Sequence, residues 1–274
     1  MKTVKVGLIQ FRIEPERSVE KTLKHAKILL EDAAKEEAQF VCFPERWNYR
    51  KGEIKDNIEA QDGPVTAFFQ KNSAELGLYI IGGAIWVYNQ DKSENYIVSG
   101  IFNPNGELLG VQRKLHLYLY EKSFFIPGEE LKIIDTELGK IGVAICFDMT
   151  FPEVARFYAL NEVDLLFSPV LIREEGVENW HIYLRARSLE NRMPICAANC
   201  VGQFIDRNYP GQSLLIDFKK GYETPSKLQV RQAPKDEEFL LIDTIDLRTA
   251  RRLRKKRLAE RLALDNKILG NRIK

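Results

Sequence analysis

Strand-like and helix-like segments alternate at both ends of this chain, and that alternation restricts the folds open to it. Near the N-terminus, residues 4–11 predict a buried strand, Ser18 can cap a helix to about residue 36, and residues 40–43 predict another strand. Near the C-terminus, a strand at residues 164–167 precedes an amphipathic helix at residues 178–191. This order is typical of α/β proteins, in which helices cover the faces of a sheet.

The middle of the chain is richer in strands. Residues 78–88, 96–102 and 107–113 have strand character, and the sequence NPNG at residues 103–106 predicts the turn between the last two. No Ser/Gly-rich linker divides the chain, and no repeat is visible. We therefore expect all 274 residues to form a single domain, with one mixed sheet or two stacked sheets covered by helices and with residues 247–274 as a basic helical tail.

Composition excludes several classes of protein. Hydrophobic residues make up 45% and charged residues 29%, as in an ordinary soluble globular protein. Lys plus Arg number 41 against 39 Asp plus Glu, and this balance argues against nucleic acid as the main partner. No apolar run approaches the ~20 residues of a membrane span, and the N-terminus lacks the features of a signal peptide. The four cysteines are scattered through apolar surroundings, so we expect a reducing cytoplasm.

Cys146 stands where a strand-like run, residues 141–145, gives way to a helix that Pro152 can begin. A cysteine on such a tight turn lies near backbone N–H groups that favour a thiolate or an oxyanion, so Cys146 is a candidate nucleophile. The alternative is a buried apolar residue, the usual state of a free cysteine. Cys196 and Cys200 share one face of a predicted strand without a partner set at zinc-site spacing, so we expect no metal or other cofactor.

A nucleophilic cysteine needs a base, and the chain has only three histidines, His25, His116 and His181. His116 lies in a long loop rich in charged and aromatic residues and is the only plausible site histidine, so a papain-like Cys–His pair stays open. A carboxylate is the other choice. Glu45 and Lys114 each follow a predicted strand directly, where α/β sheets place ligand sites, although an ordinary loop or surface role also fits each of them.

Three motifs occur in order along the chain: FPE at residues 43–45, RKLHL at 113–117 and CFDMTFPE at 146–153. Together they resemble the nitrilase superfamily, the carbon–nitrogen hydrolases, and Glu121 in EKSFFIPG resembles that family's second glutamate. The resemblance implies an α/β fold, a four-layer αββα sandwich of two mixed β-sheets flanked by helices. It also implies a homodimer or higher homo-oligomer formed through helix faces. Later motifs that resemble the family are RSLEN at 187–191 and GQSLLID at 211–217.

The resemblance further implies roles for the site residues. Cys146 would be the nucleophile, Glu45 the general base, Lys114 an oxyanion stabiliser and Glu121 a supporting carboxylate. The backbone N–H of Phe147 would be the second oxyanion donor. One base can serve both half-reactions, so no histidine is required. Residues beside the motifs on predicted loops are expected to shape the substrate pocket, namely Trp47, Tyr49, Tyr118, Thr150, Phe151 and Leu171.

The residues after the nucleophile bear on the substrate. Phe147-Asp148 is similar to the amidase side of the superfamily, whereas nitrile-cleaving members usually have Trp-Glu there. Thr150 stands where the branch resembling ω-amidases has an arginine. We expect a small-molecule amide, cleaved to carboxylate and ammonia through a cysteine thioester. The alternatives are nitrile or N-carbamoyl hydrolysis at the same site, or a non-catalytic interaction protein on this fold whose basic residues between Arg251 and Arg257 bind an anionic partner.

Overall fold

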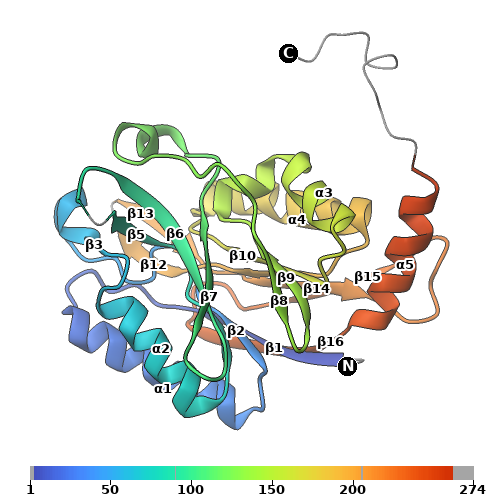
Figure 1. The fold of residues 1–274 in the computed structure, drawn as a ribbon, viewed down its shortest axis with the longest axis horizontal. Helices are drawn as coiled ribbons and strands as arrows, with labels where there is room; N and C mark the ends of the chain where they lie inside the picture. Colours follow the sequence, from blue (N-terminus) through green and yellow to red (C-terminus); the bar gives the residue numbers. More distant parts are fainter. Residues whose placement is uncertain (1–2, 90, 205, 262–274) are drawn as a thin grey trace.

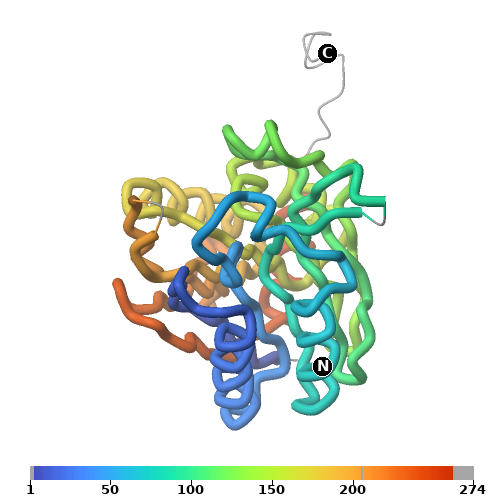
Figure 2. Tube along the Cα trace, turned by 90° about the vertical axis from the view of Figure 1, so that its left-hand side faces the viewer, coloured from blue at the N-terminus to red at the C-terminus, as the bar shows by residue number. Residues whose placement is uncertain are grey.

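The computed structural model describes residues 3–89, 91–204 and 206–261. Two β-sheets stack face to face, with α1 and α2 on the outer face of one and α3 and α4 on the outer face of the other (Figure 1). This arrangement confirms the predicted αββα sandwich. Figure 2 shows α1 in blue beside α2 in cyan along one side of the molecule. The helices are α1 (Val19–Lys35), α2 (Pro64–Leu76), α3 (Pro152–Leu160), α4 (Val177–Asn191) and α5 (Leu247–Ala259).

The first sheet is mixed and has eight strands among the described residues, in the order β16-β1-β2-β4-β6-β5-β3 with β7 paired to β6. Strand β1 pairs in parallel with β2 and antiparallel with β16, so both ends of the chain meet in this sheet. Its strands are β1 (Thr3–Gln10), β2 (Phe40–Cys42), β3 (Ile58–Ala60), β4 (Tyr79–Ile81), β5 (Ile85–Tyr88), β6 (Asn95–Phe102), β7 (Leu108–Arg113) and β16 (Phe239–Asp246).

The second sheet, as far as the structure describes it, has six strands in the order β15-β14-β11-β10-β9-β8, and its central strands β9, β10 and β11 are parallel. A separate hairpin joins β12 to β13. The strands are β8 (Ile133–Thr136), β9 (Gly139–Val143), β10 (Leu165–Pro169), β11 (Ile195–Ala198), β12 (Val201–Phe204), β13 (Arg207–Pro210), β14 (Leu214–Phe218) and β15 (Leu228–Gln232). Short 3₁₀ turns are η1 (Ile54–Asn57), η2 (Leu119–Ser123), η3 (Cys146–Thr150) and η4 (Glu174–Gly176).

The central strands are apolar on both faces because each face meets a different layer. In β10, Leu165 and Phe167 point into the core between the two sheets, whereas Leu166 points into the core beneath α3 and α4. In β2, Phe40 faces the other sheet and Val41 faces α1 and α2. Successive strand side chains point to opposite faces, so continuous apolar runs are what a buried layer requires.

Most predicted elements are present, but the strand expected at residues 78–88 is interrupted. Gly82 and Gly83 separate β4 from β5, and Gly83 has φ of +73°. A Cβ atom on Gly83 would lie 2.2 Å from the carbonyl oxygen of Pro44, so only glycine allows the chain segment after β2 to come this close. Strands β3, β13 and β15 were not expected from the sequence, because they are short and carry polar residues.

The basic C-terminal segment begins as the predicted helix, and Asp246 caps α5 by accepting from the N–H groups of Arg248 and Thr249. Several of its arginines have acidic partners: Arg251 and Arg254 both pair with Asp164. The remainder of the expected tail, residues 262–274, lies outside the described residues. Of the helices in the described part of the chain, none is both long and apolar enough to cross a membrane.

Candidate active site

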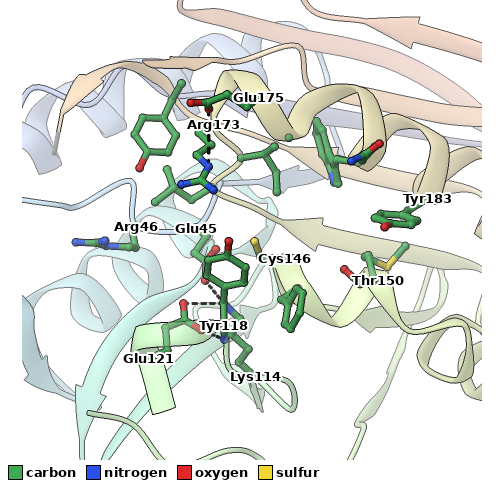
Figure 3. Close-up of a pocket in the computed structure, with 18 of the residues that line it drawn as sticks. Glu45, Arg46, Lys114, Tyr118, Glu121, Cys146, Thr150, Arg173, Glu175 and Tyr183 are labelled. Carbon is green, nitrogen blue, oxygen red and sulfur yellow. Dashed lines mark hydrogen bonds and ion pairs between the residues drawn. The ribbon is translucent and has the colours of Figure 1, made fainter. Parts of the chain in front are cut away.

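Four polar side chains from separate segments meet in a cavity of about 430 Å³ (Figure 3). They are Glu45 after β2, Lys114 after β7, Glu121 in η2 and Cys146 at the start of η3. The structure therefore brings together the four residues that the resemblance assigned to catalysis. The other cavity residues are Arg46, Tyr118, Tyr120, Phe147, Met149, Thr150, Leu171, Ile172, Arg173, Glu175, Gly176, Asn179, Trp180, Tyr183 and Tyr209.

Glu45 is fixed by its backbone. Its N–H donates to the carbonyl oxygen of Val170 at 3.1 Å, and it forms an isolated bridge with Ala84, the residue that follows the Gly82-Gly83 break. These contacts tie the segment after β2 to both sheets. Glu45 is only 2% exposed, so its carboxylate lies in a site from which bulk water is largely excluded.

Lys114 lies between two carboxylates. Its Nζ donates to Oε1 of Glu45 at 2.8 Å and to Oε1 of Glu121 at 2.9 Å, and Figure 3 shows this bridge beside Cys146. The other oxygen of Glu121 accepts from the N–H of Tyr118 at 2.7 Å, which closes the η2 turn. Lys114 is 1% exposed and Glu121 4%, and charges this deeply buried need partners on every polar atom.

The charges in the cavity act on one another. Burial alone would lower the pKa of Lys114, but Glu45, a Cys146 thiolate and Glu121 together raise it, so the lysine stays protonated. Burial raises the pKa of Glu121; Lys114 opposes that rise and Glu45 adds to it. Burial and Glu45 raise the pKa of the Cys146 thiol, against the influence of Lys114 and of the Leu171 N–H. Cys146 is therefore protonated, as a thiol, in the resting protein.

Cys146 sits on a strained turn. Strand β9 ends at Val143, earlier than the run of apolar residues predicted, and Cys146 opens the 3₁₀ turn with φ of +47°. A positive φ is costly for a residue with a side chain and is common where function fixes the backbone. Asp148 holds the turn: its Oδ2 accepts from the N–H of Ile145 at 3.0 Å, and its Oδ1 accepts from the N–H of His116 at 2.8 Å. Asp148 thus joins the turn that carries Cys146 to the segment that carries Lys114 and His116.

His116 contacts that aspartate and not the cysteine. Its Nδ1 lies 2.9 Å from Oδ1 of Asp148, and its ring stacks on Phe151 with centroids 3.9 Å apart. The other two histidines lie elsewhere: Nε2 of His25 bonds to Glu238, and Nε2 of His181 bonds to the carbonyl oxygen of Gln212. None of the three histidines lines the cavity that Glu45, Lys114, Glu121 and Cys146 share.

The residues expected to shape the pocket divide into two groups. Tyr118, Thr150 and Leu171 line the cavity, but Trp47, Tyr49 and Phe151 do not. Phe147, whose N–H was expected to be an oxyanion donor, also lines it. Three contacts account for the correction: the Trp47 indole N–H donates to the carbonyl of Gly82 in the core, Tyr49 packs on Phe204, and Phe151 covers His116.

Several lining residues were missed by sequence reasoning. Arg46 directly follows Glu45, and this adjacency is the one signal that could have identified it. Arg173, Tyr183 and Tyr209 come from distant segments, and nothing in their spacing marks them. Among the described residues, no group of three or more His, Cys, Asp or Glu side chains is placed to hold a metal ion.

Comparison with known proteins identifies the family. The model of the carbon–nitrogen hydrolase family matches residues 5–255. The chain belongs to the carbon–nitrogen hydrolase family. It is 32% identical over 211 residues to the omega-amidase NIT2-B of Xenopus laevis, a match that covers 73% of this chain and 75% of that protein. A probable nitrilase of Schizosaccharomyces pombe is 33% identical over 198 residues, covering 72% of this chain and 70% of the other.

Solved structures of the nitrilase superfamily share the fold. Nit3 of Saccharomyces cerevisiae superposes with a TM-score of 0.81 at 24% identity, and the match covers 97% of each chain. A mutant amidase from Nesterenkonia sp. AN1, solved with the acetamide moiety of fluoroacetamide added covalently at its active-site cysteine, gives a TM-score of 0.80 at 18% identity, covering 99% of this chain and 97% of the other. Both identities are low, so these likenesses concern the fold.

Proposed function

We propose that this carbon–nitrogen hydrolase cleaves small primary amides to carboxylate and ammonia, with Cys146 as nucleophile and Glu45 as base. The observation that carries the proposal is the bridge in which Lys114 contacts Glu45 and Glu121 beside Cys146, inside a cavity large enough for a small acyl group. The omega-amidases among the relatives support amides as the substrate class.

The first half-reaction forms a thioester. Glu45 accepts the thiol proton while the sulfur of Cys146 attacks the amide carbon, and the carbonyl oxygen becomes an oxyanion. The charged Lys114 and the backbone N–H of Phe147 are the proposed donors to that oxygen, and the loss of one such donor typically costs about 10²–10³ in rate. When the intermediate collapses, the proton on Glu45 moves to the departing nitrogen, which leaves as ammonia.

The second half-reaction hydrolyses the thioester with the same residues. Glu45, ionised again, accepts a proton from water, and the resulting hydroxide adds to the thioester carbon. The same two donors hold the oxyanion. When this intermediate collapses, the carbon–sulfur bond breaks, the proton on Glu45 moves to the departing sulfur, and the carboxylic acid leaves, which restores the thiol of Cys146. Lys114 keeps its proton throughout because its raised pKa makes it a poor acid, and Glu121 holds its ammonium in place.

A panel of matched amides and nitriles that share one acyl group tests the proposal. We expect kcat/KM to be higher for the amide in each pair, because attack on a nitrile develops negative charge on nitrogen and needs donors placed differently. Ammonia release is the measurement. If the nitriles or N-carbamoyl compounds are the better substrates across several pairs, the proposed amide specificity is wrong.

We also propose a homodimer, formed through the outer faces of α3 and α4. Large apolar side chains are exposed there, including Leu160 and Ile182, and such side chains on adjacent helices are typical of subunit contacts. Ile182→Arg should halve the mass measured by light scattering. Ile28→Arg, at an exposed isoleucine on α1, is the matched control and should leave the mass unchanged. A monomeric wild type would contradict the proposal.

The proposed location is the cytoplasm. All four cysteines are free, as expected of a protein from a reducing compartment.

A further inference from the structure

The strands that carry Lys114 and Cys146 belong to different sheets. Lys114 follows β7 in the first sheet, and Cys146 comes three residues after Val143, where β9 of the second sheet ends. The proposed reaction requires the ammonium of Lys114 to meet the oxyanion that forms beside the sulfur of Cys146. A displacement of about 1 Å in such a site can cost about 10²-fold in rate. The position of β7 relative to β9 therefore bears on the chemistry.

Tyr158, a residue of α3, reaches both strands. Its hydroxyl donates to the carbonyl oxygen of Val143 at 2.8 Å and lies 3.4 Å from Oε1 of Gln112 in β7. Gln112 comes two residues before Lys114, so each contact lies just before a site residue. Tyr158 is 0% exposed and Gln112 is 1% exposed, so bulk water does not reach either contact.

A glycine allows the tyrosine ring to come this close to the strand. A Cβ atom on Gly142 would lie 2.5 Å from Cδ1 and Cε1 of Tyr158, so the ring lies against β9 at a residue without a side chain. Helix α3 follows the η3 turn that Cys146 opens. The hydroxyl of Tyr158 thus returns to the strand from which that turn starts, and it fixes the strand and the helix on either side of Cys146 relative to each other.

Gln112 is held by three further hydrogen bonds to the main chain. Its Nε2 donates to two carbonyl oxygens at 2.7 and 2.9 Å, and its Oε1 accepts from an N–H at 2.8 Å; these groups belong to Arg113, Glu130 and Lys132 respectively. The N–H of Gly128 also donates to the carbonyl oxygen of Lys114 at 2.8 Å. These bonds join the two ends of the loop at residues 114–128, so a displacement of Gln112 moves the base of that loop.

The phenol of Tyr158 acts as a hydrogen-bond donor and not as an acid. Burial and the charge of Asp148 raise the pKa of Tyr158, against the influence of the bond to Val143, so the hydroxyl stays protonated. Without this hydroxyl, the carbonyl oxygen of Val143 would lose a donor in a place that water does not reach. A buried acceptor without a donor is unfavourable, and a shift of the strands is the way to relieve it.

We propose that Tyr158 is a positioning residue, whose hydroxyl links β7 to β9 and thereby holds Lys114 where it can stabilise the oxyanion beside Cys146. Tyr158 does not line the cavity, so it acts through Gln112 and Val143 and not on the substrate. The inference rests on the proposed amide hydrolysis and adds to it a residue from the outer layer of the fold.

Tyr158→Phe tests the proposal, because it removes the hydroxyl and keeps the ring. Loss of an oxyanion donor costs about 10²–10³ in rate, so its displacement should lower kcat for an amide by about 10- to 100-fold. KM should stay within about twofold, because the interaction that is weakened is made in the transition state. Tyr158→4-aminophenylalanine keeps an N–H donor at the same place and should recover most of the lost kcat.

Tyr79→Phe is the matched control. Tyr79 is also a buried tyrosine, and its hydroxyl accepts from the N–H of Glu137 at 3.4 Å, in the turn between β8 and β9 and not at the end of β9 near the site. It does not line the cavity. We expect this variant to keep the wild-type kcat and KM.

Alkylation of Cys146 by iodoacetamide, measured on its peptide by mass spectrometry, gives a readout that does not depend on turnover. Lys114 opposes the rise in the pKa of Cys146, so its displacement should move the alkylation profile to higher pH in Tyr158→Phe and not in Tyr79→Phe. Failure of Tyr158→Phe to fold, or a lower melting temperature as its only change, would assign Tyr158 a purely structural role and overturn the proposal. A raised KM with an unchanged kcat would also overturn it. If no amide releases ammonia, the proposed function fails, and the alkylation profile still decides whether Tyr158 positions Lys114.

Discussion

Substitution of Glu45 by glutamine tests the proposed base separately from the rest of the site. Glutamine keeps an oxygen that can accept from Nζ of Lys114, which lies 2.8 Å from the glutamate oxygen, and Glu121 continues to neutralise the lysine. We therefore expect the variant to fold. What is lost is a proton acceptor at a residue that is only 2% exposed, where water is poorly placed to replace it.

The loss of activity can be bounded. A thiol with an ordinary pKa of about 8.5 is only about 3% thiolate at pH 7, and burial makes the Cys146 thiol a weaker acid still. Without the base, the fraction of Cys146 that can attack as thiolate should be about 30-fold or more too small. Without proton delivery to the leaving nitrogen, the rate should fall by a further factor of about 10²–10⁴. Together these give a decrease in kcat/KM of at least about 10³-fold, measured by ammonia release.

The same substitution should have the opposite effect on alkylation. Glu45 is one of the groups that raise the pKa of Cys146, so its neutralisation should lower that pKa. The rate of reaction with iodoacetamide should then rise at a lower pH in Glu45→Gln than in the wild type, while amide hydrolysis collapses. Near-normal hydrolysis in this variant would refute the assignment of the base. An unshifted alkylation profile together with lost hydrolysis would show that the substitution had only damaged the site.

Three further outcomes are expected. His116→Ala should retain substantial ammonia release, because its ring contacts Asp148 and not the nucleophile; a defect larger than that of Glu45→Gln would revive a Cys–His mechanism. EDTA should leave activity unchanged, and loss of activity that zinc restores would contradict this. Burial raises the pKa of Glu59 to about 7, so the folded state binds more protons than the unfolded state between about pH 4.3 and pH 7. The free energy of unfolding therefore decreases as the pH rises through that window. The glutamine in Glu59→Gln can still accept a hydrogen bond from the N–H of Val65. This variant should therefore have a free energy of unfolding about 2 kcal/mol higher than the wild type at pH 8, and an unchanged one at pH 4. Equal melting temperatures of the two proteins at pH 8 would refute the argument.

The elements that depend on local sequence were predictable. Ser18 caps α1 as expected, and Gly77 ends α2 in the left-handed conformation. The FPE, RKLHL, EKSFFIPG and CFDMTFPE motifs located four polar residues that share one cavity. These features follow from capping, glycine conformation and recognisable motifs.

The direction of individual side chains was not predictable, because it depends on contacts between distant segments. Trp47 lies two residues after Glu45 and was expected in the pocket. Arg46 has φ of +55°, however, and its guanidinium lines the cavity while Trp47 turns into the core beside Gly82. The break at Gly83 has the same origin, since the close approach of Pro44 becomes visible only in three dimensions.

The acyl-enzyme on Cys146 is the most direct test of the mechanism. The wild type would be mixed with an amide substrate, quenched in acid within milliseconds and measured by intact-protein and peptide mass spectrometry. The account predicts a mass increase equal to the acyl group less one hydrogen, located on the peptide that carries Cys146 and absent from Cys146→Ala. An adduct on any other residue, or turnover by Cys146→Ala at the wild-type rate, would contradict it.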